Sequence, residues 1–195
     1  DETGFWVTNI KKIINSPRKQ ILYDYYKEKN VFDKGCTIPH CLDPKHNEYL
    51  TLHGTTKICA KIICESGFDI NRARDKGKLG SGIYTTNNLV RANIYAGKEK
   101  SSVKSVIVCR IVLSNTMYTE TIETKKDGFD SVCYCNPNTN LHEYMITQEQ
   151  YIIPIYIIEY IDLADTKSID YIFTKTDIKL GRFIELYDYY PRVIT

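Results

Sequence analysis

"LGSGIYTTNNLVRANIYAG", residues 79–97, decides the fold that we predict for this chain. Residues 82–86 read as a strand, and the Gly-x-Gly before them supplies a turn. Asn87 or Asn88 then caps a helix that runs to about Tyr95, because asparagine side chains accept hydrogen bonds from the first helical N–H groups. The glycine that follows ends the helix. The stretch therefore predicts a strand, a cap and a helix in immediate succession.

A similar unit lies upstream of this stretch. Residues 49–53 read as a short strand that ends at His53. Thr56 is placed to cap a helix that reaches about Glu65, and Gly67 is placed to end it. The first half of the chain therefore contains two short strands, each followed by a capped helix.

The N-terminal segment, residues 7–29, has apolar residues mostly three or four apart, which is the spacing of a helix. Pro17 interrupts or restarts this helix, with Ser16 as the N-cap. Residues 33–48 are predicted to be a loop because they contain two prolines and a glycine. Residues 69–80 are polar and basic, and we predict a loop there as well.

After residue 97 the apolar runs are rich in β-branched residues, as strands are. Pro154 indicates an edge or a bulge in its strand, because proline cannot donate a ladder hydrogen bond. Helices come first and strands dominate later, so we predict an α+β fold with antiparallel strands. The predicted strands in this half are 103–113, 130–135, 143–147 and 151–161.

The composition is that of an ordinary globular domain, with 43 % hydrophobic and 26 % charged residues among 195. A net charge of +2 indicates neither a nucleic acid nor an acidic membrane as partner. No apolar run reaches the roughly 18 residues of a membrane span, so we predict none. The odd number of cysteines, seven, indicates a reducing intracellular setting, nuclear or cytoplasmic. Because the chain starts at Asp1 without Met, we interpret it as part of a longer protein.

Four local features are candidates for a functional site. His53-Gly54 ends a strand, Tyr84 follows the Gly-x-Gly turn, Tyr95 ends a helix and Glu143 starts a late strand. Each feature alone is ordinary, because a histidine at a strand end is more often structural and a glutamate there is usually solvated. Tyrosine is also frequent in the chain, with sixteen copies. The informative observation is the combination of these features in this order.

Together the features resemble the catalytic domain of poly(ADP-ribose) polymerase-type, diphtheria-toxin-like ADP-ribosyltransferases. The matching stretches are YLTLHGTT, ESGFD, LGSGIYTTNNLVRANIYA, DGFDSV and HEYMITQEQYIIPIYIIEY. The resemblance covers about residues 5–161, so we assign residues 1–161 to this catalytic domain and 162–195 to an extension packed on it. It implies a fold of split antiparallel β-sheets with flanking helices.

The resemblance also implies a transferase that cleaves the bond between nicotinamide and ribose in its substrate NAD+. Tyr95 is implied to stack on the nicotinamide ring, with Tyr84 as the opposite wall. The backbone of Gly54 is implied to bond the carboxamide, because a residue without a side chain lets a ligand approach closely. His53 is implied to hydrogen-bond a ribose hydroxyl of NAD+.

The catalytic residue that the resemblance implies is Glu143. A carboxylate bonded to the ribose 2′-hydroxyl favours the positive charge that develops on the ribose as nicotinamide leaves. His53, Tyr84 and Glu143 form the version of the family's triad that permits polymer formation. The implied acceptors of ADP-ribose are proteins, including the chain itself.

One position departs from the family pattern. The family usually has a serine three residues before the stacking tyrosine, and this chain has Ala92 there. The missing hydrogen bond is worth about 0.5–1.5 kcal/mol, so we expect weaker binding of NAD+ or of nicotinamide-like inhibitors unless Arg91 or Asn93 compensates. The loop before Tyr84 is basic, and it either meets the NAD+ pyrophosphate or is simply solvated. Its basic residues are Arg72, Arg74, Lys76 and Lys78.

A cluster of possible metal ligands, Cys36, His40, Cys41 and His46, does not have the spacing of a known zinc finger. The adjacent His40 and Cys41 would point apart in an extended loop, so we predict no metal site. Two alternatives to a protein ADP-ribosyltransferase remain open. Ala92 favours a binding module that has lost turnover, and a transferase acting on nucleic-acid ends has little support from a net charge of +2.

Overall fold

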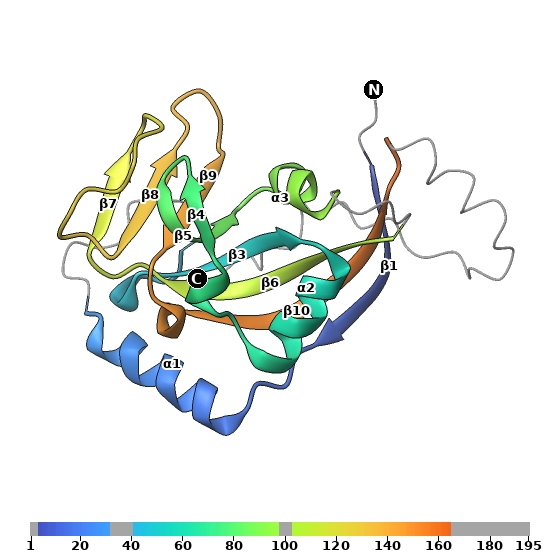
Figure 1. Cartoon of the computed structure of the whole chain (residues 1–195), viewed down its shortest axis with the longest axis horizontal. Coiled ribbons are helices and arrows are strands. Elements are labelled where there is room, and N and C mark those ends of the chain that lie inside the picture. Colours follow the sequence, from blue (N-terminus) through green and yellow to red (C-terminus); the bar gives the residue numbers. More distant parts are fainter. Residues whose placement is uncertain (1–3, 32–40, 98–102, 165–195) are drawn as a thin grey trace, which may run out of the picture.

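The computed structural model of the chain describes residues 4–31, 41–97 and 103–164, and Figure 1 shows their arrangement. Within these residues the fold is mixed α+β, which confirms the predicted class. Its helices are α1 (Pro17–Lys29), α2 (Lys57–Ser66) and α3 (Leu89–Ala96). Its strands are β1 (Phe5–Lys12), β2 (Cys41–Asp43), β3 (Glu48–Thr55), β4 (Arg74–Gly77), β5 (Gly80–Thr86), β6 (Lys104–Val112), β7 (Thr116–Thr119), β8 (Ser131–Cys135), β9 (His142–Ile146) and β10 (Ile152–Asp162).

The strands form one path in the order β1-β10-β6-β3-β5-β9-β8-β7, with β2 added to β3 and β4 added to β5. Neighbouring strands are antiparallel, as predicted, except that β7 and β8 run parallel. Three short strands, β2, β4 and β7, were not predicted. Each has only three or four residues, which is too short for a period-two pattern to show in the sequence.

The sheet is split between β3 and β5. These two strands share a single pair, Leu52 with Thr86, whereas β3 pairs with β6 from Glu48 to Thr55. Figure 1 accordingly shows two parts of the sheet. One part contains β3, β6 and β10, and the other, drawn above it, contains β4, β5, β7, β8 and β9. This divergence leaves space between the two parts of the sheet.

The hydrophobic core lies on both faces of β6, which is buried along almost its whole length. Helix α2 places Ala60 on the face that carries Ile107 and Cys109. Helix α3 covers the other face, where Ala92 packs near Val106. Because both faces are covered, β6 reads in the sequence as a continuous apolar run rather than as an alternating one.

The helix predicted over residues 7–29 is wrong in its first half. Residues 5–12 form β1, which pairs with β10 along the edge of the sheet. Local spacing did not show this, because the hydrogen-bond partners of β1 lie about 150 residues away in the sequence. The predicted restart is confirmed: α1 begins at Pro17 and Ser16 occupies the N-cap position.

The predicted ends of α2 and α3 are confirmed. The Thr56 hydroxyl accepts a hydrogen bond from the Cys59 N–H at 3.3 Å, and Gly67 ends α2 with φ +80°. The Asn88 side chain accepts from the Arg91 N–H at 3.0 Å at the start of α3. The predicted irregularity at Pro154 is also present, as a register shift between Pro154 and Tyr156 in β10.

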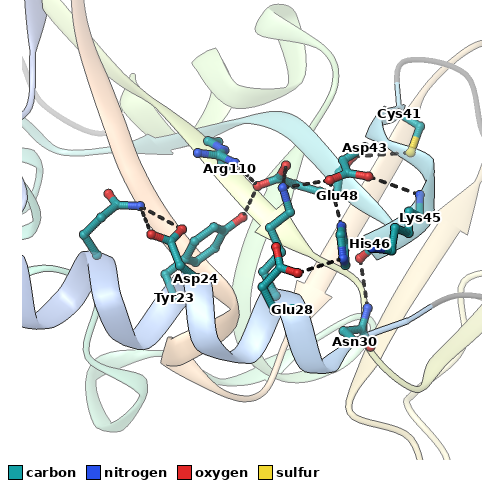
Figure 2. Close-up of polar contacts among 12 residues, drawn as sticks. Tyr23, Asp24, Glu28, Asn30, Cys41, Asp43, Lys45, His46, Glu48 and Arg110 are labelled. Carbon is teal, nitrogen blue, oxygen red and sulfur yellow. Dashed lines mark hydrogen bonds and ion pairs between the residues drawn. The ribbon is translucent and has the colours of Figure 1, made fainter.

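A cluster of buried charges attaches α1 to the sheet (Figure 2). Glu48, only 1 % exposed, accepts hydrogen bonds from the Tyr23 hydroxyl at 2.8 Å and from Lys27 Nζ at 2.9 Å. Arg110 Nη2 lies 2.6 Å from the same carboxylate. Lys27 also pairs with Asp43 at 2.8 Å. These bonds join the helix to β2, β3 and β6 at the side of the sheet away from α3.

No helix in the described part of the chain has the length and apolarity that a membrane crossing requires. The proposed extension, residues 162–195, lies outside the described residues from position 165 onward. Its predicted packing on the domain therefore stays a prediction.

Candidate functional site

A pocket of about 670 Å³ lies where β3 and β5 diverge. The six residues that the family resemblance assigns to the site all line it. They are His53, Gly54, Tyr84, Ala92, Tyr95 and Glu143. The structure thus brings together side chains from β3, β5, α3 and β9, although their individual roles stay predictions.

The strand register explains why these residues meet. Pairing between β3 and β5 stops at Leu52, so the next two residues, His53 and Gly54, lie beside the opening. On the other side β5 pairs with β9, and Thr86 faces Glu143. Glu143 is therefore brought to the pocket by a strand that is nearly sixty residues further along the chain than β5.

His53 is held in one orientation. Its Nδ1 lies 2.8 Å from the carbonyl oxygen of Tyr84, and its ring makes an edge contact with Phe68 at a centroid distance of 5.1 Å. A carbonyl can only accept, so Nδ1 carries the proton and Nε2 is the acceptor atom of the neutral ring. Burial lowers the pKa of His53, while the bond to Tyr84 partly opposes this. The imidazole is therefore neutral at pH 7.

Tyr84 is anchored by the turn that precedes it. Its hydroxyl donates to the Gly80 carbonyl at 2.6 Å and accepts from the Leu79 N–H at 2.9 Å. Gly80 has φ +115°, a backbone conformation that favours glycine, so the turn predicted at Gly80 and Gly82 is present at Gly80. Gly82 lies inside β5 instead, where it pairs with Arg74 of β4. The hydroxyl is thus engaged by the turn, and the ring is fixed as part of the pocket wall.

A glycine is required at position 54 because the backbones of β3 and α3 pack closely against each other there. A Cβ at this position would lie 1.8 Å from the carbonyl oxygen of Ala92 in α3. From the sequence we expected a glycine here because a ligand must come close to the backbone. The structure gives a second reason, because the backbone of α3 also packs directly against Gly54. Ala92 itself is 1 % exposed and packs with Ala96, Val106 and Tyr160.

Glu143 is only 7 % exposed and forms an ion pair with Arg91, whose Nε contacts Oε1. The Arg91 guanidinium also lies 5.8 Å from the centroid of the Tyr95 ring. The hydrogen bond to Glu143 raises the pKa of Arg91 above its already high value. Arg91 thereby links the carboxylate of the pocket to one of its aromatic walls.

From the sequence, Arg91 was expected only as a substitute for a missing hydroxyl, and its pairing with Glu143 was not predicted. The i, i+4 spacing of Arg91 and Tyr95 was a signal that both lie on one face of α3. Asn93, the other suggested substitute, points elsewhere. It donates to Asp162 at 2.6 Å and accepts from the Tyr160 hydroxyl at 2.9 Å. Only Arg91 of the two lines the pocket.

The rim of the pocket carries charges of both signs, because Asp69 and Glu149 line it as well as Arg72 and Lys78. Arg72 and Lys78 line it and are exposed, and Arg72 Nε lies 3.4 Å from Asp69. The side chains of Arg74 and Lys76 lie outside what the structure describes. The predicted loop is also partly a strand, since Arg74–Gly77 form β4 beside β5. The pocket therefore combines aromatic walls, a carboxylate, a neutral imidazole and a rim of mixed charge that includes Arg72 and Lys78. This suits a ligand with a flat ring, hydroxyls and phosphates.

The cysteines and histidines considered as metal ligands have other partners where they are described. The Cys41 thiol donates to the Glu48 carbonyl at 3.4 Å. His46 lies between Asp43, at 2.8 Å, and Glu28, at 3.5 Å, as Figure 2 shows. Cys36 and His40 lie outside the described residues. Within residues 4–31, 41–97 and 103–164 we find no group of three or more such side chains arranged to hold a metal.

Comparison with known proteins yields one family. The family model for the poly(ADP-ribose) polymerase catalytic domain matches residues 3–171, most of the chain. No curated protein matches the sequence.

Proposed function

Because the chain belongs to the poly(ADP-ribose) polymerase catalytic domain family, we propose that it cleaves NAD+ and transfers ADP-ribose to proteins, including itself. The observation that supports this best is the meeting of His53, Tyr84 and Glu143 in one pocket of about 670 Å³. They come from three separate strands. A pocket of this volume suits a drug-sized or dinucleotide ligand.

In the proposed complex the nicotinamide ring lies between Tyr95 and Tyr84. The half-buried rings offer the stacking surface that a flat cationic ring needs. Gly54 lies where β3 has lost its partner β5, and it lines the pocket. In the proposed complex its backbone bonds the carboxamide. His53 accepts a hydrogen bond from a ribose hydroxyl through Nε2, and the exposed Arg72 and Lys78 attract the pyrophosphate.

The reaction breaks the C1′–N bond, and its electron pair leaves with nicotinamide, which departs neutral. The ribose becomes positively charged, and the Glu143 carboxylate stabilises this charge through the 2′-hydroxyl. A hydroxyl oxygen of the acceptor then bonds C1′, and its proton passes to water. Arg91 is a positioning residue in this scheme, because its ion pair holds the carboxylate in one orientation without the need for contact with the substrate.

The test is incubation of the chain with labelled NAD+, followed by mass spectrometry of the protein product. We expect ADP-ribose on the parent and a loss of labelling in Glu143→Ala. Glu65→Ala is the matched control, because this glutamate is exposed on α2. Labelling of Glu143→Ala at the parent's rate would show that the assigned role is wrong. A ladder on a gel would indicate polymer formation, and a discrete band the transfer of single units.

The alternative of a binding module without turnover is supported by Ala92, which has no hydroxyl to offer a carboxamide. Calorimetry separates the two proposals. Heat of NAD+ binding without any ADP-ribosylated product favours the module, whereas binding with product favours the transferase.

A further inference from the structure

Glu143 lies close to the start of its strand, where a strand is least firmly held. Strand β9 begins at His142, and residues 137–140 just before it are exposed. Strand ends beside exposed loops open most easily, because few buried contacts hold them. A carboxylate that must meet one hydroxyl of a substrate has to keep a fixed position. The start of β9 therefore needs an anchor in addition to its strand pairing.

Asn87, the residue that follows β5, supplies this anchor through its side chain. Its amide oxygen accepts a hydrogen bond from the His142 N–H at 2.8 Å, and its amide nitrogen donates to the Asn140 carbonyl at 2.7 Å. The same nitrogen lies 3.2 Å from Nδ1 of the His142 ring. A backbone N–H can only donate and a carbonyl can only accept, so these partners fix the orientation of the amide. One side chain thus bonds the backbone on both sides of Leu141.

The carbonyl of His142 is held by the same segment. It accepts a hydrogen bond from the Thr86 hydroxyl at 2.8 Å and another from the Asn87 N–H at 3.3 Å. This carbonyl belongs to the peptide bond that joins His142 to Glu143, and a peptide bond is planar. Fixing the carbonyl therefore fixes the backbone from which the Glu143 side chain leaves.

The segment also holds the ionic partner of Glu143. The Thr86 hydroxyl accepts from the Asn88 N–H at 3.2 Å, and the Asn88 side chain accepts from the Arg91 N–H at 3.0 Å. Arg91 in turn forms the ion pair with Glu143. Asn87 is not among the described residues that line the pocket, whereas Arg91 and Glu143 are. Its influence on the site is therefore exerted through the backbone of β9.

We propose that Asn87 is a positioning residue for Glu143. This inference rests on the proposed function, because it gives Asn87 a role in the turnover of NAD+. The Asn87 side chain holds the start of β9 so that the carboxylate meets the ribose 2′-hydroxyl in one geometry. A misplacement of about 1 Å at a reacting centre costs about 10² in rate. The effect falls on kcat and leaves KM nearly unchanged, because no contact with the substrate is removed.

The test compares Asn87→Ala with Asn136→Ala, and a thermal melt establishes that each variant is folded. Asn136 is the matched control, because it lies at the start of the same loop and its side chain also bonds the backbone, accepting from the Asn138 N–H at 2.9 Å. We expect Asn87→Ala to lower kcat for NAD+ cleavage roughly tenfold or more with KM nearly unchanged. Asn136→Ala should keep the kcat of the parent.

Asn87→Asp is the conservative variant. Its carboxylate still accepts from the His142 N–H, and it also accepts from Nδ1 once that nitrogen carries the ring proton. It cannot donate to the Asn140 carbonyl. We therefore expect Asn87→Asp to recover part of the kcat that Asn87→Ala loses.

Hydrogen exchange measured by NMR gives a second readout, which does not involve NAD+. The His142 amide should exchange faster in Asn87→Ala than in the parent or in Asn136→Ala, because its acceptor is lost. Unchanged exchange at His142 overturns the proposal. An active parent with the same kcat as folded Asn87→Ala overturns the role of Asn87 alone. A parent that does not cleave NAD+ overturns the proposed function, and the role of Asn87 in turnover with it.

Discussion

Two buried glutamates of this domain are paired with arginine, and they differ in how completely they are bonded. Glu48 is 1 % exposed and is bonded by Tyr23, Lys27 and Arg110 (Figure 2). Glu143 is 7 % exposed, and among the described residues its one ionic partner is Arg91. Glu48 lies in the attachment of α1, whereas Glu143 lines the pocket.

The difference separates a structural carboxylate from one that is available for chemistry. A buried carboxylate needs several donors to compensate for its lost hydration, and Glu48 has them. Glu143 has fewer protein donors but borders a cavity, where a ligand hydroxyl can supply what is missing. The comparison predicts that the same change of Glu to Gln will affect stability at one site and turnover at the other.

The largest effect is expected at the structural site. Glu48→Gln removes the charge that Lys27 and Arg110 share, and loss of one partner of a buried ion pair typically costs about 3–5 kcal/mol. Urea unfolding should show this loss in the free energy of unfolding, with NAD+ turnover per folded molecule unchanged. Glu28→Gln, next to Lys27 on α1, is the control, because this side chain is 67 % exposed. A stability equal to that of the parent would contradict the structural reading of Glu48.

The reverse pattern is expected at the pocket. Glu143→Gln should lower the rate of NAD+ cleavage by about 10²–10³, the usual effect of removing one preorganised transition-state interaction. Its free energy of unfolding should change by less than about 1 kcal/mol, because Arg91 is partly exposed and water can solvate it. Rate and unfolding are measured on the same preparations. A large loss of stability with normal turnover would place Glu143 in the same class as Glu48.

An intermediate effect is expected at Arg91. Arg91→Gln should lower kcat roughly tenfold or more while KM changes little, because a charged hydrogen bond to Glu143 is lost and no substrate contact is removed. Arg91→Lys should recover part of kcat, since lysine keeps the charge but lacks the guanidinium geometry. Arg18→Gln, on the exposed side of α1, is the control. If only KM rises in Arg91→Gln, then Arg91 contacts the substrate and does not position Glu143.

The sequence alone predicted the parts of the fold that are encoded locally. The caps at Thr56 and Asn88 and the glycine after α2 involve residues a few positions apart, so their pattern is visible in a short window. The buried run of β6 was equally clear. The strand β1 was missed because its partner, β10, is supplied by the far end of the domain.

The candidate site shows the same division. The resemblance supplied six residues, and all of them line one pocket. The partner of Glu143 was not predictable, because Arg91 is 52 residues away and meets it only through the pairing of β5 with β9. Contacts of this kind depend on strand register, which a single sequence specifies only weakly before the sheet is known.

The smallest effect is expected where the chain departs from its family. Ala92→Ser restores the usual hydroxyl at a position that is 1 % exposed and borders the pocket. One neutral hydrogen bond is worth about 0.5–1.5 kcal/mol, so nicotinamide should bind roughly 2- to 10-fold more tightly, as measured by calorimetry. Ala96→Ser, in the same helix and buried but outside the pocket lining, is the control for the added oxygen alone. Equal affinity in the parent and in Ala92→Ser would contradict this expectation. It would mean that the close packing of α3 on Gly54 leaves no room for the serine hydroxyl to turn toward a ligand. The pocket would then recognise nicotinamide through its aromatic walls and the Gly54 backbone.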